Sequence, residues 1–153
     1  MLKKEKTSMR IQEYPFLYVE TITLEQVQVS PPHIRYNNQR HLKLHKFGKG
    51  PFCKFKINHN DNHSGVYALI IGKKVKYIGE CQNLRNRFNQ GYGNISPRNC
   101  YEGGQQTNCH INNEIKNAIK NGNRVLLYFC VCCNDREEIE RKLIINKKPC
   151  WNL

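Results

Sequence analysis

The clearest alternation of hydrophobic and polar positions lies in the middle of the chain. A β-branched, apolar run covers residues 66–71 (VYALII), and a matching run covers residues 75–79 (VKYIG). Gly72 and Lys73 between them form a turn signal, so the two runs predict a β-hairpin. A third apolar run, at residues 124–132 (RVLLYFCVC), predicts a buried strand.

Helical periodicity separates these strands and follows the last of them. Asn83 can cap a short helix that reaches about Phe88. Residues 110–121 (HINNEIKNAIKN) repeat apolar positions at helical spacing and stop before Gly122. Residues 135–146 (DREEIERKLIIN) predict a helix with acidic residues in its first turn. The order hairpin, helix, helix, strand, helix predicts an antiparallel α/β domain with a small sheet.

The pattern before residue 61 is irregular. Pro-Pro and a Gly-Lys-Gly-Pro cluster interrupt any long helix, while HLKLHKF (41–47) and PFCKFKI (51–57) suggest edge strands. We therefore expect a basic extension of short strands and loops over residues 1–61, attached to a domain over residues 62–153. Interleaved basic and aromatic residues in this extension suit a DNA-contacting surface. They are equally typical of a solvated basic face with ordinary core aromatics, and the sequence leaves both interpretations open.

The charge of the chain indicates which kind of partner it binds. The chain of 153 residues carries a net charge of +13, which favours an anionic partner, most commonly nucleic acid. No apolar run reaches the length of a membrane span, and the start lacks the apolar stretch of a signal peptide. We therefore expect an intracellular, cytoplasmic protein without a membrane partner.

We interpret the eight cysteines as small hydrophobic residues rather than as disulfides or zinc ligands. This interpretation agrees with the expectation of an intracellular protein. The one C-x-x-C pair, Cys130 and Cys133, has no second pair at matching spacing to complete a quartet, whereas structural zinc sites usually contain two such pairs. Disulfides are rare inside cells. Cys130 and Cys132 lie within the apolar run that predicts a buried strand.

Five short motifs, in order, resemble the GIY-YIG nuclease superfamily. They are GVY (65–67), YIG (77–79), NLRNR (83–87), IERKLI (139–144) and KPCWN (148–152). The resemblance covers residues 64–153 and suggests a restriction-type or phage-like member, of bacterial or phage origin. It implies a small three-stranded antiparallel sheet flanked by helices. It also implies hydrolysis of DNA phosphodiester bonds with the assistance of Mg²⁺ or Mn²⁺.

Residue by residue, the resemblance implies Tyr67, Tyr77, Arg87 and Glu140 as catalytic residues. Tyr67 is our preferred general base, and Tyr77 would position groups or relay a proton. Arg87 would stabilise charge, because a guanidinium cannot act as a base. Glu140 would be the metal ligand, since Mg²⁺ prefers hard oxygen donors.

One position departs from the family pattern. Many members place a histidine four residues after the motif arginine, whereas this chain has Gly91 there. His63 and His110 are the candidate substitutes, although a lone histidine is more often structural or exposed. The group that replaces the family histidine is therefore left open.

Helix geometry offers a separate argument for Glu140. Glu137 and Glu138 each have a basic residue four positions later, as solvent-facing ion pairs do. Glu140 instead has Ile144 at that position, which places it at the edge of the apolar stripe. A carboxylate turned toward the core needs a partner, and a metal ion fits that need. The alternative is a boundary glutamate bonded to a residue of the sheet.

The relation between the two tyrosines depends on the register of the hairpin. A two-residue turn puts Tyr67 and Tyr77 on opposite faces of the sheet, whereas a three-residue turn puts them on the same face. The sequence does not decide between these turns, and the resemblance favours convergence. Gly65 and Gly79 would then let backbone and substrate approach closely.

The remaining expectations concern DNA. We expect Lys76, Arg85, Arg98 and Asn152 to contact double-stranded DNA. For Asn152, an equal alternative is that it anchors the chain end and does not touch DNA. A restriction-type enzyme of this length would read a short palindromic site as a homodimer. The alternatives are a non-catalytic basic nucleic-acid-binding module, which would need no metal carboxylate, and a homing or repair nuclease of the same family.

Overall fold

The computed structural model describes residues 7–153, which form two compact units. Unit 1 contains the described residues up to Ile22 together with Asn58–Arg85 and Arg124–Leu153. Unit 2 contains Thr23–Ile57 and Asn86–Asn123. Each unit is thus assembled from segments that lie far apart in the sequence, and this division cuts across the boundary expected between residues 61 and 62.

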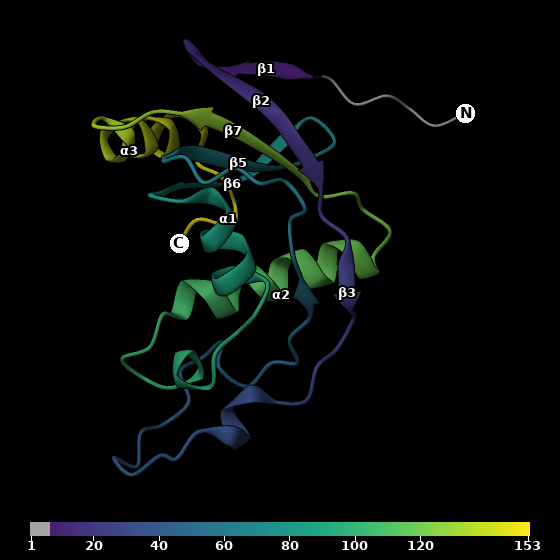
Figure 1. Cartoon of the computed structure of the whole chain (residues 1–153), viewed down its shortest axis with the longest axis vertical. Coiled ribbons are helices and arrows are strands. Elements are labelled where there is room, and N and C mark those ends of the chain that lie inside the picture. Colours follow the sequence, from purple (N-terminus) through teal and green to yellow (C-terminus); the bar gives the residue numbers. More distant parts are fainter. Residues whose placement is uncertain (1–6) are drawn as a thin grey trace. The chain divides into compact units, whose positions relative to one another are not determined.

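Unit 1 is built on an antiparallel sheet with the strand order β1-β2-β7-β5-β6 (Figure 1). Its strands are β1 (Ser8–Ile11), β2 (Tyr14–Thr21), β5 (Gly65–Ile71), β6 (Lys74–Cys81) and β7 (Leu126–Val131). The three strands that the sequence predicts are neighbours, with β5 in the centre. The expected number of three strands is wrong, because the hairpin of β1 and β2 extends the sheet beyond β7.

Helix α3 (Arg136–Lys147) packs against one face of this sheet (Figure 1). Ile139 and Leu143 of the helix join a buried core that also contains Val66, Ala68 and other side chains of that face. Because side chains alternate along a strand, Tyr67 and its neighbour two positions on lie on the opposite face of β5. The chain is therefore a mixed α/β protein, as expected.

Unit 2 contains the longest helix of the described chain, α2 (Gln106–Lys120), and little regular sheet. Its other elements are β3 (Leu24–Gln26), η1 (Pro32–Arg35), β4 (Lys54–Phe55), η2 (Arg87–Tyr92) and η3 (Pro97–Cys100). The second segment of unit 2 begins at Asn86, the last residue of α1 (Leu84–Asn86). A small core of Phe52, Ile95, Cys100 and Cys109 holds these elements together.

Asparagine side chains take the place of a longer strand ladder in unit 2. The amide of Asn112, which is fully buried, bonds both the N–H and the carbonyl of Cys53, and also the carbonyl of Tyr92. The amide of Asn89 bonds the N–H and the carbonyl of Ile57 in the same way. Buried backbone groups need such partners, and the two-residue strand β4 supplies too few.

Several expected elements differ in extent. The alternation at 41–47 forms only an isolated bridge between Leu44 and Tyr101, and the one at 51–57 forms only β4. The short helix expected to end near Phe88 continues as a π-helical turn to Tyr92. All eight cysteines are free thiols. Within residues 7–153, no helix is long and apolar enough to cross a membrane.

Candidate active site

Tyr67 and Tyr77 lie on the same face of the sheet in unit 1. The turn between β5 and β6 has two residues, since Ile71 pairs with Lys74, but the register shifts further along. Lys76 is left without a partner in the ladder, and Tyr77 pairs with Leu69. This β-bulge turns Tyr77 to the face of Tyr67. The two ring centroids are 6.1 Å apart, so a bulge produces the convergence that the sequence left undecided.

The glycine of each motif makes room for the protein's own atoms. A Cβ atom on Gly79 would lie 2.4 Å from the hydroxyl oxygen of Tyr67, and one on Gly65 would lie 2.2 Å from the carbonyl oxygen of Cys130. Gly79 therefore allows the Tyr67 ring to lie across β6. Protein atoms fill the space beside both glycines, whereas the sequence led us to expect that substrate also approaches there.

The two tyrosines differ in exposure. Tyr67 is fully buried, whereas Tyr77 retains 8% of its surface. Both also make further polar or ring contacts. A substrate approaching this face of the sheet therefore meets Tyr77 more directly than Tyr67.

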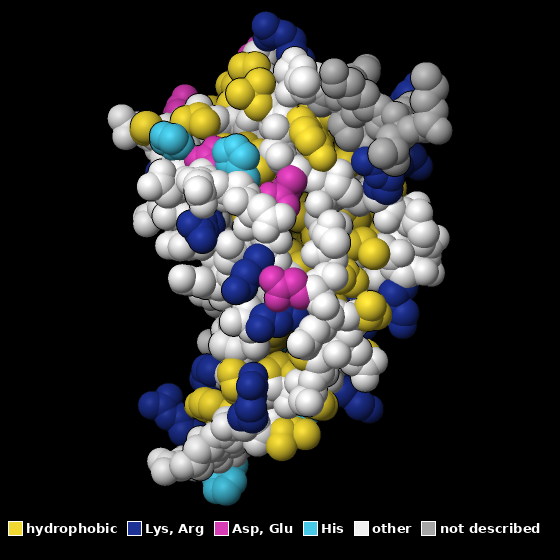
Figure 2. All heavy atoms as spheres, turned by 45° about the vertical axis from the view of Figure 1, so that its right-hand side comes forward, with side chains coloured by type: hydrophobic (Ala, Val, Ile, Leu, Met, Phe, Trp, Pro, Cys, Tyr) yellow, Lys and Arg dark blue, Asp and Glu magenta, His cyan; other side chains and the backbone are white. Residues whose placement is uncertain are grey.

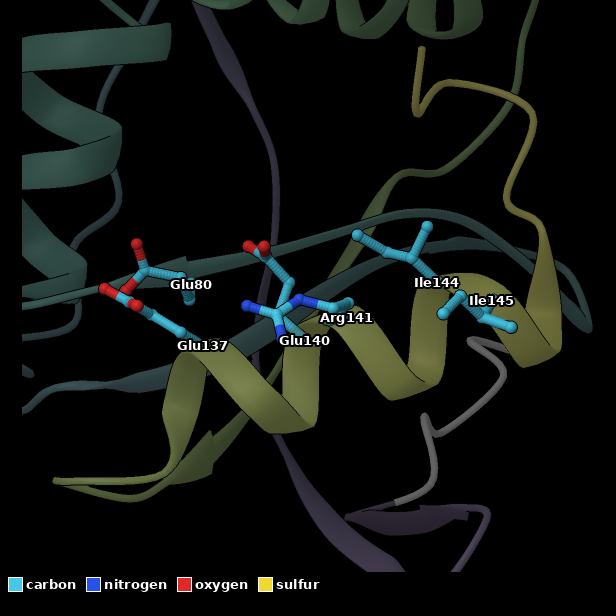
Figure 3. A pocket seen from close by; sticks show the side chains of 6 residues that line it. All are labelled: Glu80, Glu137, Glu140, Arg141, Ile144 and Ile145. Carbon is cyan, nitrogen blue, oxygen red and sulfur yellow. The ribbon is translucent and has the colours of Figure 1, made fainter.

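Glu140 lies half-buried on α3, at a cavity of about 320 Å³ within unit 1. The lining residues are Glu80 on β6 and Glu137, Glu140, Arg141, Ile144 and Ile145 on α3 (Figure 3). The carboxylates of Glu80, Glu137 and Glu140 project to the same side of the helix in this view. The cavity is therefore lined by three carboxylates, one guanidinium and two apolar side chains.

Arg136 neutralises part of this negative charge. Its Nε donates to Oε2 of Glu80 at 2.7 Å, and this hydrogen bond raises the pKa of the arginine. Arg136, four residues before Glu140 on α3, thus forms an ion pair with the sheet. Among residues 7–153, no three His, Cys, Asp or Glu side chains lie close enough together to hold a metal ion. The donor set at Glu140 suits Mg²⁺, which keeps several waters and often takes only one or two protein carboxylates.

The C-terminal segment covers the outer edge of β6. The side-chain amide of Asn152 accepts from the N–H of Ile78 at 3.0 Å and donates to its carbonyl at 2.8 Å. The N–H of Trp151 donates to the carbonyl of the bulged Lys76. Asn152 therefore anchors the chain end, and its amide is largely committed to the strand backbone.

Arg87 belongs to unit 2, where two side chains fix its guanidinium. Nη2 donates to the hydroxyl of Tyr92 at 3.0 Å, and Nη1 donates to Oδ1 of Asn108 at 3.2 Å. The guanidinium also stacks 4.4 Å from the centroid of the Tyr92 ring. Asn108 is buried and in turn donates to Gln105. Tyr92 and Asn108 were not predicted as partners of Arg87, because the π-helical spacing to Tyr92 leaves no hydrophobic pattern and Asn108 lies on a separate helix, α2.

Gly91, where the resemblance would place a histidine, lies beside this arginine. A Cβ atom on Gly91 would meet Asn108 at 3.5 Å and Arg87 at 3.9 Å, which is ordinary contact. Of the candidate substitutes, His63 is exposed and bonds Asp61 at 2.7 Å in unit 1. His110 is buried in unit 2.

The three basic residues expected to contact DNA have different surroundings. Lys76 is the half-buried residue of the β-bulge. Arg85 is exposed and is the last residue of the segment Asn58–Arg85 of unit 1. Arg98 is half-buried in unit 2, where its Nη1 donates to the carbonyl of Glu102 at 3.1 Å. Arg98 therefore braces a loop with part of its bonding capacity.

Comparison with known proteins adds no relative to this description. No family model, curated protein sequence or solved structure matches the chain.

Proposed function

We propose that this chain is a metal-dependent DNA endonuclease of the GIY-YIG type, and that it cuts a short duplex site as restriction enzymes do. The observation that carries the proposal is the convergence of Tyr67 and Tyr77 through the bulge at Lys76. A hairpin needs no bulge to be stable, and bulges are frequent beside active sites, where they redirect a side chain. In a binding module the same two phenols would serve only to pack the sheet.

Phosphodiester hydrolysis needs an activated water, compensation of the added negative charge and protonation of the leaving oxygen. In the proposed reaction Tyr67, in its phenolate form, accepts the proton of the attacking water, Tyr77 positions the water or relays this proton, and solvent water supplies the proton of the leaving oxygen. A free tyrosine has a pKa of about 10, so these phenols work only if the surroundings favour proton transfer. Arg87 would meet the transition-state charge with a fork of fixed geometry.

Glu140 is the residue that would hold Mg²⁺ or Mn²⁺ in this scheme. A bound divalent ion supplies a Lewis acid for the phosphate oxygens. The half-buried carboxylate of Glu140 projects from α3 beside other carboxylates at an open cavity (Figure 3), which is the hard oxygen chemistry that such ions prefer.

The assignment is tested with supercoiled plasmid DNA and Mg²⁺ or Mn²⁺. We expect the wild-type protein to nick or linearise the plasmid and Glu140→Gln to lower the rate by at least about 100-fold, because a preorganised charge at the reacting phosphate is removed. DNA affinity, measured with EDTA, should change little. Glu138→Gln is the matched control, since Glu138 is exposed on the same helix and lies outside the cavity. Undiminished cleavage by Glu140→Gln would remove the metal role of this residue.

A further inference from the structure

The positive charge of the chain is divided unequally between its two units. Unit 2 holds eleven Lys and Arg against three Asp and Glu, a net charge of +8 on 73 residues. The described residues of unit 1 hold eleven against eight, a net charge of +3 on 74 residues. No acidic residue occurs between Glu25 and Asp61. The unit with less regular sheet thus carries the denser positive charge.

Much of this charge sits on residues 33–49, which we call the basic loop. All five of its basic side chains are exposed: Arg35, Arg40, Lys43, Lys46 and Lys49. The basic loop contains no acidic residue. By contrast, Lys116 of the same unit is buried and donates to the carbonyl of Pro51, and its burial lowers its pKa. The exposed charge therefore belongs chiefly to the basic loop.

Backbone hydrogen bonds to residues 98–102 fix the backbone of the basic loop. The N–H of His45 donates to the carbonyl of Cys100 at 3.1 Å, and the N–H of Glu102 donates to the carbonyl of Lys43 at 2.8 Å. These bonds and the bridge between Leu44 and Tyr101 use the inner side of the loop. A loop fixed in this way presents its charges at defined positions, which lowers the entropy cost of binding.

Aromatic and arginine side chains complete the support. The rings of Tyr36 and Tyr101 lie 5.1 Å apart, and the hydroxyl of Tyr101 donates to the carbonyl of His33 at 3.0 Å. Arg98 lies 6.0 Å from the Tyr36 ring. These rings pack on one another, so they serve the loop's shape and are not free platforms for stacking bases. Recognition by this surface would accordingly be electrostatic.

A polar cavity of about 240 Å³ adjoins the basic loop within unit 2. Arg35 and Lys54 contribute cations to its lining, and Ser30, Gln26 and Asn94 contribute neutral hydrogen-bonding groups. No acidic residue lines it. This combination suits a phosphate group, which accepts hydrogen bonds from cations and from neutral donors alike.

We infer that unit 2 is the part of the chain that binds duplex DNA, through backbone phosphates contacted by the basic loop, which includes Arg35, and by Lys54. Lys and Arg side chains are also dispersed over the face in Figure 2, where Asp and Glu show at few points. Scattered cations match a backbone of evenly spaced phosphates, and contacts of this kind carry little sequence information. The inference takes its partner, DNA, from the proposed function, but it requires no cleavage.

The inference is tested by measuring the affinity of the protein for a short fluorescent DNA duplex, in EDTA and at several salt concentrations. The test variant is Arg40→Gln, Lys43→Gln and Lys46→Gln combined in the basic loop. The matched control neutralises three exposed lysines of unit 1, namely Lys73, Lys74 and Lys147. Because each lost phosphate contact reduces the slope of log affinity against log salt by about 0.9, the test variant should reduce the slope by about 2 to 3. The control should reduce it by less than about 1.

Equal losses in the two variants, or no loss in either, would overturn the inference, since the charge would then act diffusely or serve solubility. Tighter binding to an RNA duplex of the same length would also overturn it. Thermal melting shows whether both variants stay folded, as expected for substitutions of exposed side chains. If DNA is bound as described while wild-type protein leaves the plasmid intact with Mg²⁺, the proposed nuclease function fails and this inference stands.

Discussion

At the scale of single residues, the arginine of the NLRNR motif differs from its basic neighbours by how it is held. Arg87 bonds Tyr92 and Asn108 and stacks on the Tyr92 ring, whereas Arg85 is exposed and bonds Asn60 at 3.1 Å. A guanidinium fixed by two acceptors loses little entropy when it meets a phosphate. The structure therefore separates an oriented cation from an ordinary surface cation two positions away.

Replacing this arginine should affect the chemical step rather than binding. Arg87→Ala is expected to lower the single-turnover cleavage rate by about 10²–10³-fold, as the loss of one preorganised donor does. Arg87→Lys should restore little, because one ammonium cannot bond Tyr92 and Asn108 and also present a fork. Arg85→Ala is the control and should leave the single-turnover rate near normal. Equal small losses at both positions would show that Arg87 is an ordinary surface cation.

Individual candidate residues could be selected from the sequence where they belong to a motif, whereas the partners that folding brings to them could not. Arg87 and Glu140 stand in recognisable motifs. Asn108 and Tyr92 show no periodicity: the π-helical turn brings Tyr92 to Arg87, and the packing of α2 against that turn brings Asn108 there. Asn152 could be read as a DNA contact or as an anchor, and only the structure reveals its two bonds to Ile78.

At the scale of elements, the β5–β6 hairpin depends on Gly79 to seat the ring of Tyr67. The alternation of hydrophobic residues predicts both strands, but it does not fix the register, because a bulge adds a residue without changing the composition. The hairpin β1–β2 was not predicted as part of the sheet, since its partner β7 lies about a hundred residues away. Long-range pairing of this kind leaves no local signal.

Adding one methyl group tests the seating of Tyr67. In Gly79→Ala the new Cβ would overlap the Tyr67 hydroxyl and ring, so we expect a loss of about 1–3 kcal/mol in the free energy of unfolding. Denaturant titration measures this change. Gly91→Ala is the control, because its Cβ would make only ordinary contacts in a helical turn, and Ala is favoured there by up to about 1 kcal/mol. A stable Gly79→Ala protein would mean that the Tyr67 ring can move aside freely.

At the scale of the whole molecule, composition predicted the charge but not its distribution. The net charge of +13 points to an anionic partner, whereas the sequence alone divides it almost evenly between the first 60 residues and the rest. Folding combines residues 23–57 with residues 86–123 and concentrates +8 in that unit. The extension expected over residues 1–61 is therefore shared between the units, because β2 pairs with β7 in unit 1 and β3 pairs with β4 in unit 2.

The central claim is that the paired tyrosines perform chemistry rather than packing. Its most direct test is the single-turnover cleavage rate of Tyr67→Phe with Mg²⁺ and saturating protein. The control is Tyr128→Phe, since Tyr128 is also buried in the sheet, opposite Ala68 on the face that α3 covers. Each change removes one hydroxyl and should lower the free energy of unfolding by a similar amount, about 0.5–1.5 kcal/mol.

We expect Tyr67→Phe to cleave about 10²–10⁴-fold more slowly than the wild-type protein, as the loss of a general base predicts. Tyr128→Phe should cleave at nearly the wild-type rate. A Tyr67→Phe protein that cleaves as fast as the Tyr128→Phe control would contradict the account.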